Sequence, residues 1–258
     1  MTVDAAGTAE LRIVGSSGEA AIGAADAIVD ALVAAVGARG IAHWATTGGS
    51  TAPAQYAALS EPARRDAIPW ASVHVWWGDE RYVPYDHPLS NALPFDQRQG
   101  HDLPVPALNV HRVPTAEALE EGRGAAWAAT RYGVDLQDAG LADGSTAGAL
   151  DVVVVGIGPD GHLLSVFPGS AVWDAAAAVA AVPAPTHVEP HVERVTLHPS
   201  YLAAARRIVV VATGAAKAEA LGRAWTPATD VRETPARAAV RPGAIWFVDE
   251  AAAARIPR

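Results

Sequence analysis

The chain has 258 residues, of which 50% are hydrophobic and 18% are charged. That composition argues against a disordered tail protein and against a small module stabilised by disulfides. The chain has 19 basic and 28 acidic residues, which gives a net charge of −9. This balance argues against an ordinary basic nucleic-acid binder. An anionic ligand would have to be held by a local group of residues against the overall field of the protein.

The sequence lacks cysteine, so disulfides and thiolate chemistry are excluded. The first seven residues have neither the basic nor the apolar part of a signal peptide. No apolar run approaches the ~18 residues that span a bilayer. The nine histidines show no metal-binding spacing, so we expect no metal. We therefore expect a cytoplasmic protein that binds neither membrane nor nucleic acid.

Strands and helices are expected to alternate from the N-terminus onward. A short strand at 11–14 precedes a helix, for which Ser16 and Glu19 form a capping box. Six apolar residues at helical spacing then predict the face of that helix that packs on the core. They are Ile22, Ala25, Val29, Leu32, Val33 and Val36.

The remaining predicted elements continue this alternation. Strands are expected at 41–46, 73–77, 151–155, 208–213 and 244–248, and helices at 53–59, 116–132, 215–225 and 250–256. Long loops are expected at 78–99, 156–169 and 179–195. The pattern predicts an α/β protein with a mainly parallel sheet, organised as a single domain over residues 1–258.

Four polar, glycine-rich segments each begin where a predicted strand ends. They are Gly48–Thr51, Gly78–Arg81, Gly156–His162 and Thr213–Lys217. Because open parallel sheets bind ligands at the carboxyl ends of their strands, we expect the four segments to converge on one crevice.

The first segment leads from a strand into a helix. Gly48 and Gly49 allow the backbone to approach a ligand, and the free N–H groups of a helix start attract anions. Ser50 and Thr51 add hydroxyl groups. This pattern is typical of a phosphate-binding loop, and equally of a plain turn in which Thr51 caps the helix.

The segment Gly156–Gly161 matches the G-x-G-x-x-G pattern of dinucleotide-binding proteins. Pro168 leaves little room for the helix that such a site needs, and the required acidic residue is missing around 175–182. The segment instead offers His162 beside Asp160, a candidate for proton transfer or a structural histidine.

The other two segments carry charged residues. Arg81 and Lys217 are candidates to bind a phosphate, while Asp79 and Glu80 are candidates to bind sugar hydroxyls or to orient a base. The alternatives are a solvated charged turn at 79–81 and an exposed lysine at position 217.

At these residues the sequence resembles the 6-phosphogluconolactonases, whose fold is shared with glucosamine-6-phosphate deaminases and ribose-5-phosphate isomerases. The resemblance implies a Rossmann-like α/β fold with helices on both faces of the sheet. The matching stretches follow the order of the family and extend from about residue 42 to residue 248. They are Gly48–Thr51, Trp77–Pro84, Ser90–Asn91, Asp151–Ser170 and Arg194–Leu221.

The resemblance implies hydrolysis of 6-phospho-D-glucono-1,5-lactone to 6-phosphogluconate in the oxidative pentose phosphate pathway, with no cofactor or metal. His162 would be the general base, and Asp160 would bind substrate or orient that base. The protein would be a monomer or a small homo-oligomer. The implied substrate-binding residues are Gly48, Gly49, Ser50, Thr51, Asp79, Glu80, Arg81, Asn91, Gly161, Arg194 and Lys217.

Three short stretches depart from the pattern of this family: Leu163–Leu164, Ala52–Pro53 and 92–94. Two alternative functions remain open. One is isomerase or deaminase chemistry on an amino-sugar phosphate, with Asp79 or Glu80 as the base near C2. The other is a sugar-phosphate sensor that binds without catalysis.

Overall fold

The computed structural model describes residues 2–4, 9–143 and 146–257. Its strands are β1 (Thr2–Asp4), β2 (Glu10–Val14), β3 (Ala42–Thr46), β4 (Val73–Trp77), β5 (Asp79–Arg81), β6 (Val110–His111), β7 (Ala142–Asp143), β8 (Thr146–Ala147), β9 (Val152–Gly156), β10 (Val179–Val182), β11 (Arg194–Leu197), β12 (Arg207–Ala212) and β13 (Ala244–Asp249). Its α-helices are α1 (Ser17–Arg39), α2 (Ala52–Ser60), α3 (Pro62–Arg65), α4 (Leu93–Asp96), α5 (Thr115–Glu120), α6 (Ala125–Asp138), α7 (Ser200–Ala204), α8 (Ala218–Ala224) and α9 (Glu250–Ala253).

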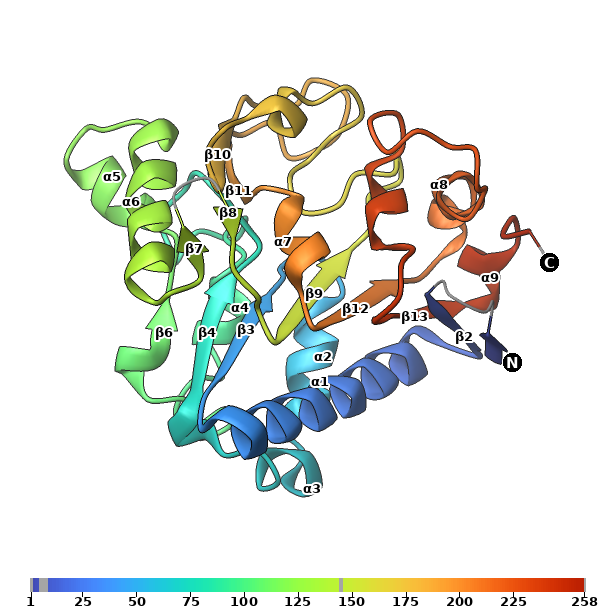
Figure 1. The fold of residues 1–258 in the computed structure, drawn as a ribbon, viewed down its shortest axis with the longest axis horizontal. Coiled ribbons are helices and arrows are strands. Elements are labelled where there is room, and N and C mark those ends of the chain that lie inside the picture. Colours follow the sequence, from blue (N-terminus) through green and yellow to red (C-terminus); the bar gives the residue numbers. More distant parts are fainter. Residues whose placement is uncertain (1, 5–8, 144–145, 258) are drawn as a thin grey trace.

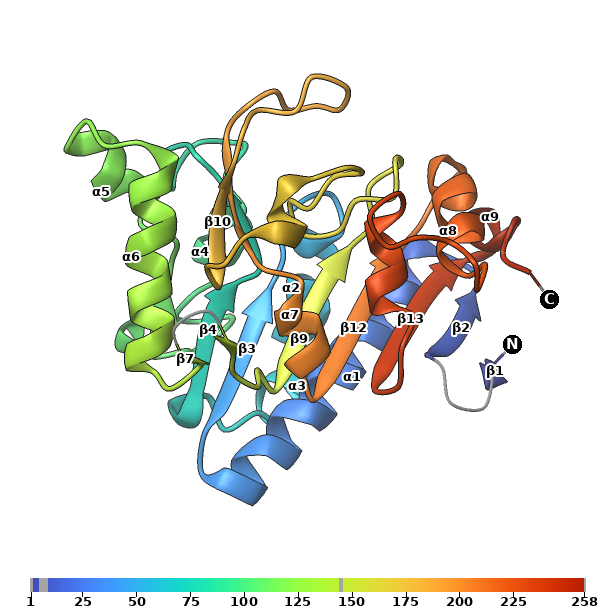
Figure 2. The same ribbon diagram turned by 45° about the horizontal axis from the view of Figure 1, so that its top comes forward.

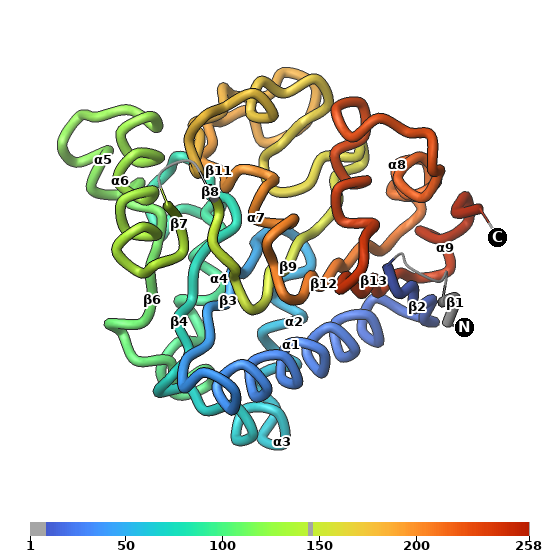
Figure 3. Tube along the Cα trace, in the orientation of Figure 1, coloured from blue at the N-terminus to red at the C-terminus, as the bar shows by residue number. Residues whose placement is uncertain are grey.

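The largest sheet has the strand order β1-β2-β13-β12-β9-β3-β4-β6 (Figure 1). All neighbours from β2 to β6 are parallel, and β1 is antiparallel to β2. The central strand β9 is a continuous valine run that is fully buried, as expected for a strand covered on both faces. The last helix, α9, lies next to β2 (Figure 3), and β1 pairs with the same strand. The predicted α/β class with a mainly parallel sheet is confirmed.

Helix α1 begins as the capping box predicts, because the backbone N–H of Glu19 donates to Ser16 Oγ at 3.1 Å. The predicted core face is wrong at two positions, since Ile22 is 46% exposed and Val33 is 41% exposed. The buried face consists mostly of alanines. Gly23 shows why: a Cβ at this position would lie 2.4 Å from the ring of Phe247 in β13. Close approach of the helix backbone to the sheet therefore decides which residues are buried.

Helix α1 also corrects the expectation that no apolar segment is long enough to cross a bilayer. It has 23 residues and is apolar enough for its length and composition to suffice. In the structure it packs against β12, β13 and β3. Ala24, Ile28 and Leu32 are fully buried there, so contact with the sheet accounts for its apolar character.

A second, antiparallel sheet has the order β10-β11-β5 and is covered by α6 (Figure 2). This sheet overturns two expectations, because 78–99 and 179–195 are not uninterrupted loops. Asp79 pairs with Thr196 and Arg81 pairs with Arg194 across the sheet. The partner strands are more than 100 residues apart in the chain, so no local pattern signals the pairing. The charged segment 79–81 is therefore a strand and not a solvated turn.

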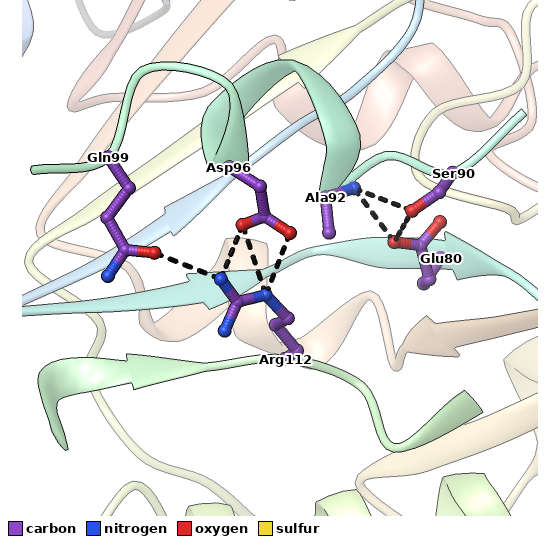
Figure 4. A network of polar contacts seen from close by, with 6 residues as sticks. All are labelled: Glu80, Ser90, Ala92, Asp96, Gln99 and Arg112. Atoms are coloured by element: carbon purple, nitrogen blue, oxygen red, sulfur yellow. Dashed lines mark hydrogen bonds and ion pairs between the residues drawn. The ribbon is translucent and has the colours of Figure 1, made fainter. Parts of the chain in front are cut away.

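Two other elements differ from the sequence prediction. The helix expected at 116–132 is divided into α5 and α6, with Gly122 in the left-handed region (φ +64°) between them. Helix α4 lies inside a predicted loop, and a residue far along the chain holds it in place. Figure 4 shows Arg112 bonded to Asp96 of α4, at 3.1 Å from Nε, and to Gln99, at 3.0 Å from Nη2.

Candidate active site

A pocket of about 260 Å³ lies where β3, β4, β9 and β12 end. The four segments that were predicted to converge all contribute to its walls. Of the predicted site residues, those that line it are Gly48, Gly49, Ser50, Thr51, Asp79, Arg81, Asn91, His162, Arg194 and Lys217. Asp160, Glu80 and Gly161 are not among its lining residues, and each has a different position, described below.

His162 is oriented by Asp160, two residues earlier in the same turn. The Nδ1 atom of His162 lies 2.6 Å from Asp160 Oδ1, and the backbone N–H of His162 donates to the same oxygen at 3.1 Å. Burial alone would raise the pKa of Asp160, but its hydrogen bonds and charge interactions with His162, and a hydrogen bond from His187, hold it well below the usual range. The ionised carboxylate can only accept, so Nδ1 carries a hydrogen. In the neutral imidazole, the Nε2 atom of His162 therefore has its lone pair free.

Two glycines shape this turn. A Cβ on Gly158 would lie 2.0 Å from His162 Nδ1 and 2.6 Å from Asp160 Oδ1, so only glycine leaves room for the pair. Gly161 has a φ of +96°, and its carbonyl oxygen accepts from the backbone of Ala236 at 2.8 Å. Gly161 is not among the residues that line the pocket, and its positive φ turns the backbone between Asp160 and His162; its contact with substrate stays a prediction.

The loop before α2 presents an open helix start to the pocket. A Cβ on Gly48 would lie 1.9 Å from Asn91 Oδ1, and Gly49 has a φ of +75°. Thr51 makes no side-chain capping bond to α2, so the alternative of a plain capped turn is not observed. Pro53, the second residue of α2, has no N–H, so the backbone donors at this helix start are those of Ala52 and Ala54. Thr51 caps neither of them with its side chain, an arrangement that favours an anion.

Three cationic side chains line the pocket: Arg81, Arg194 and Lys217. The Nη1 of Arg81 donates to a carbonyl oxygen at 2.8 Å, while its buried Nε has no hydrogen-bond partner among the described residues. Burial lowers the pKa of Arg194 and of Lys217; Asp79 opposes this at Arg194, and Asp160 opposes it at Lys217. Within the described part of the chain, none of the three cations forms an ion pair with a carboxylate. The pocket is therefore locally cationic in an acidic protein.

Glu80 does not face the pocket and is only 1% exposed. Its carboxylate accepts from the backbone N–H groups of Arg81 (2.7 Å), Asn91 (2.6 Å) and Ala92 (2.9 Å). Figure 4 shows the contact with Ala92 and a further one from Ser90. Burial raises the pKa of Glu80 to about 7, although the backbone donors oppose this rise. The expectation that Glu80 binds substrate is not supported; instead it fastens the segment of Asn91 to β5.

Asp79 has the opposite orientation and lines the pocket. Its Oδ2 accepts from Ser165 Oγ at 2.6 Å, and its Oδ1 accepts from Asn91 Nδ2 at 3.3 Å. The Oδ1 of Asn91 is buried and has no partner among the described residues. Asp79 and Asn91 therefore present fixed oxygen acceptors at the wall, a chemistry suited to hydroxyl groups.

The stretch Leu163–Leu164, which departs from the sequence pattern of the family, affects one wall of the pocket. Leu163 is fully buried, while Leu164 lines the pocket with a φ of +53°. A Cβ on Gly78 would lie 2.7 Å from Leu164 Cδ2, so Gly78 makes room for this side chain. The wall is apolar here, and a residue held in the left-handed region is typical of a functional site.

Sequence reasoning did not single out two features of the pocket. One is the steric role of Gly158. The other is the segment before β11, from which Val188 and Glu189 line the pocket. No local motif marks that segment, because its place is set by the pairing of β10, β11 and β5.

Comparisons with known proteins agree with this architecture. The family model described as glucosamine-6-phosphate isomerases/6-phosphogluconolactonase matches residues 16–248. The 6-phosphogluconolactonase of Mycobacterium tuberculosis is 34% identical over 231 residues, covering 89% of this chain and 91% of that protein. That of Streptomyces coelicolor is 31% identical over 240 residues, covering 91% and 90%. A solved 6-phosphogluconolactonase from Trypanosoma cruzi superposes with a TM-score of 0.81 at 25% identity, over 96% of this chain and 97% of that one. The chain therefore belongs to the glucosamine-6-phosphate isomerase/6-phosphogluconolactonase family.

Proposed function

We propose that this chain is an enzyme that hydrolyses 6-phospho-D-glucono-1,5-lactone to 6-phosphogluconate in the oxidative pentose phosphate pathway. The relatives named above carry the name of that activity. One observation carries the proposal. A histidine whose Nδ1 is tied to Asp160, so that Nε2 of the neutral ring is free, lines a pocket that also carries three cations without an ion pair among the described residues.

In the proposed reaction, Nε2 of His162 takes a proton from a water molecule as the water oxygen attacks C1 of the lactone. The tetrahedral intermediate then collapses with cleavage of the bond between C1 and the ring oxygen. The imidazolium returns its proton to that ring oxygen, which leaves as a hydroxyl group, and C1 becomes a carboxylic acid. Asp160 stabilises the transient positive charge on His162. One positioned base contributes roughly 10²–10⁴-fold, which suits an already activated ester.

The cationic residues are assigned to the 6-phosphate. Arg81 and Lys217 bind its oxygens, together with the loop Gly48–Thr51 and the open start of α2. Arg194 is buried and also bonds to backbone carbonyl oxygens, so it adds positive charge from behind. Asp79 and Asn91 are assigned to the hydroxyl groups of the sugar ring.

The test follows the decay of the lactone, corrected for spontaneous hydrolysis. Wild-type protein is expected to accelerate decay, and His162→Ala to lose nearly all of that acceleration. His101→Ala is the control, because His101 has a 93% exposed side chain and does not line the pocket. Equal decay with wild type and His162→Ala would defeat the assignment. Release of ammonia from glucosamine 6-phosphate by the wild type would support the deaminase alternative instead.

A further inference from the structure

The loop of residues 183–193 joins β10 to β11 and has no part in the mechanism above. Figure 2 shows it rising from these two strands. Val188 and Glu189 of this loop line the pocket. At its base, the buried Arg194 donates from Nη2 to the carbonyl oxygen of Pro190 at 2.8 Å. The loop is therefore anchored at the strand end, while its middle reaches the site.

His187 connects the middle of this loop to the turn of the candidate base. Its Nε2 lies 3.0 Å from Asp160 Oδ2, on the carboxylate whose Oδ1 contacts His162 at 2.6 Å. The rings of His187 and Phe167 meet edge to face at 5.7 Å, and Phe167 lies 4.7 Å from the ring of His162. Both oxygens of one carboxylate are thus engaged by imidazoles from different parts of the chain.

The direction of this bond follows from the state of the carboxylate. Asp160 is ionised, because its contacts with His162 and His187 hold its pKa well below the usual range. An ionised carboxylate only accepts, so Nε2 of His187 carries the hydrogen. Two further cations surround Asp160: the charge of Lys217 acts on it, and Arg223 Nη2 donates to its carbonyl oxygen at 3.1 Å.

We propose that His187 is a positioning residue, which fastens the pocket-lining loop 183–193 to the carboxylate that orients His162. The kinetic part of this inference rests on the proposed function, whereas the connection itself exists without any reaction. Loss of His187 frees the loop and withdraws Val188 and Glu189 from the pocket. It also leaves Asp160 with one imidazole, so the carboxylate holds the proton of His162 more strongly.

The experiment compares His187→Ala, His187→Gln and the control Thr186→Ala, an exposed neighbour in the same loop. Hydrogen exchange of 183–193 without substrate is expected to be at least about threefold faster in His187→Ala. It should stay near the wild-type rate in His187→Gln, whose amide N–H can still donate to Asp160, and in Thr186→Ala. The NMR titration midpoint of the His162 ring should move to higher pH in His187→Ala alone.

With lactone as substrate, His187→Ala should raise KM severalfold and shift the acidic limb of the kcat/KM profile in the same direction. Unchanged exchange and an unchanged His162 titration in His187→Ala would overturn the inference, whatever the activity. Exchange in His187→Gln as fast as in His187→Ala would also overturn it. A wild type that fails to hydrolyse the lactone overturns the proposed function, while the exchange and NMR measurements still decide the role of His187.

Discussion

The backbone of Gly158 lies against the imidazole of His162, so that a methyl group on its Cα would be 2.0 Å from Nδ1. The same methyl group would be 2.6 Å from Asp160 Oδ1. A turn with a side chain at position 158 therefore has no room for this pair in its present geometry.

Gly158→Ala is expected to displace His162 and to lower kcat by about 10²-fold, since a shift of about 1 Å in a reacting group has that effect. Lactone hydrolysis checks the rate, and circular dichroism checks that the fold is kept. The control is Gly37→Ala, because a Cβ at Gly37 in α1 would meet none of the described atoms within 4 Å apart from the adjacent backbone of its own helix. A Gly158→Ala protein with wild-type kcat would contradict the steric role.

Arg81→Gln and Lys217→Gln are each expected to raise KM for the phosphorylated lactone by about 10- to 100-fold, because a hydrogen bond to a charged group contributes about 1.5–3 kcal/mol. KM for unphosphorylated gluconolactone should change little. The matched control is Arg98→Gln, whose guanidinium pairs with Asp102 at 3.2 Å away from the pocket. Equal effects on both lactones would remove Arg81 and Lys217 from the phosphate site.

Stability is expected to fall as pH drops, because three imidazoles lie together on the neighbouring strands β3, β4 and β6. The Nδ1 of His74 is 2.9 Å from His111 Nε2, and the rings of His43 and His74 are 5.2 Å apart. Burial and the neighbouring imidazoles lower the pKa of His43 and His111 to about 4, and burial lowers that of His74. Between pH 6.5 and about 4 the unfolded chain binds protons that the folded chain does not, so the free energy of unfolding decreases through that window.

Urea unfolding at pH 7, 6 and 5 measures this slope. His111→Asn should reduce the histidine contribution, since one of the three groups and its charge interaction with the other two are removed, while His101→Ala should leave it unchanged. Glu80 has the opposite effect on the free energy of unfolding in part of the same pH window. Its pKa is raised to about 7 in the folded chain, so there the folded chain binds a proton that the unfolded chain does not. The comparison of variants therefore isolates the histidines, and identical slopes in His111→Asn and wild type would contradict their role.

The sheet and the convergence of its strand ends were predictable because their signals are local. A buried valine run marks β9, and Gly40 at the end of α1 has the left-handed φ of +76° that favours glycine. The small sheet was not predictable, because β5 is a strand only through its pairing with β11. The same pairing explains why the side chains of Glu80 and Asp79 point in opposite directions. Successive side chains alternate along a strand, so in β5 the carboxylate of Glu80 points inward to backbone donors and that of Asp79 points to the pocket.

The placement of Lys217 has a practical consequence. It is the single lysine in the sequence and lines the pocket, and burial lowers the pKa of its ammonium group, with Asp160 opposing. The protein therefore has one side-chain primary amine, at the place assigned to the phosphate. Acylation of that amine, followed by mass spectrometry of proteolytic peptides that separates Lys217 from the N-terminal α-amine, reports ligand occupancy and needs no engineered label.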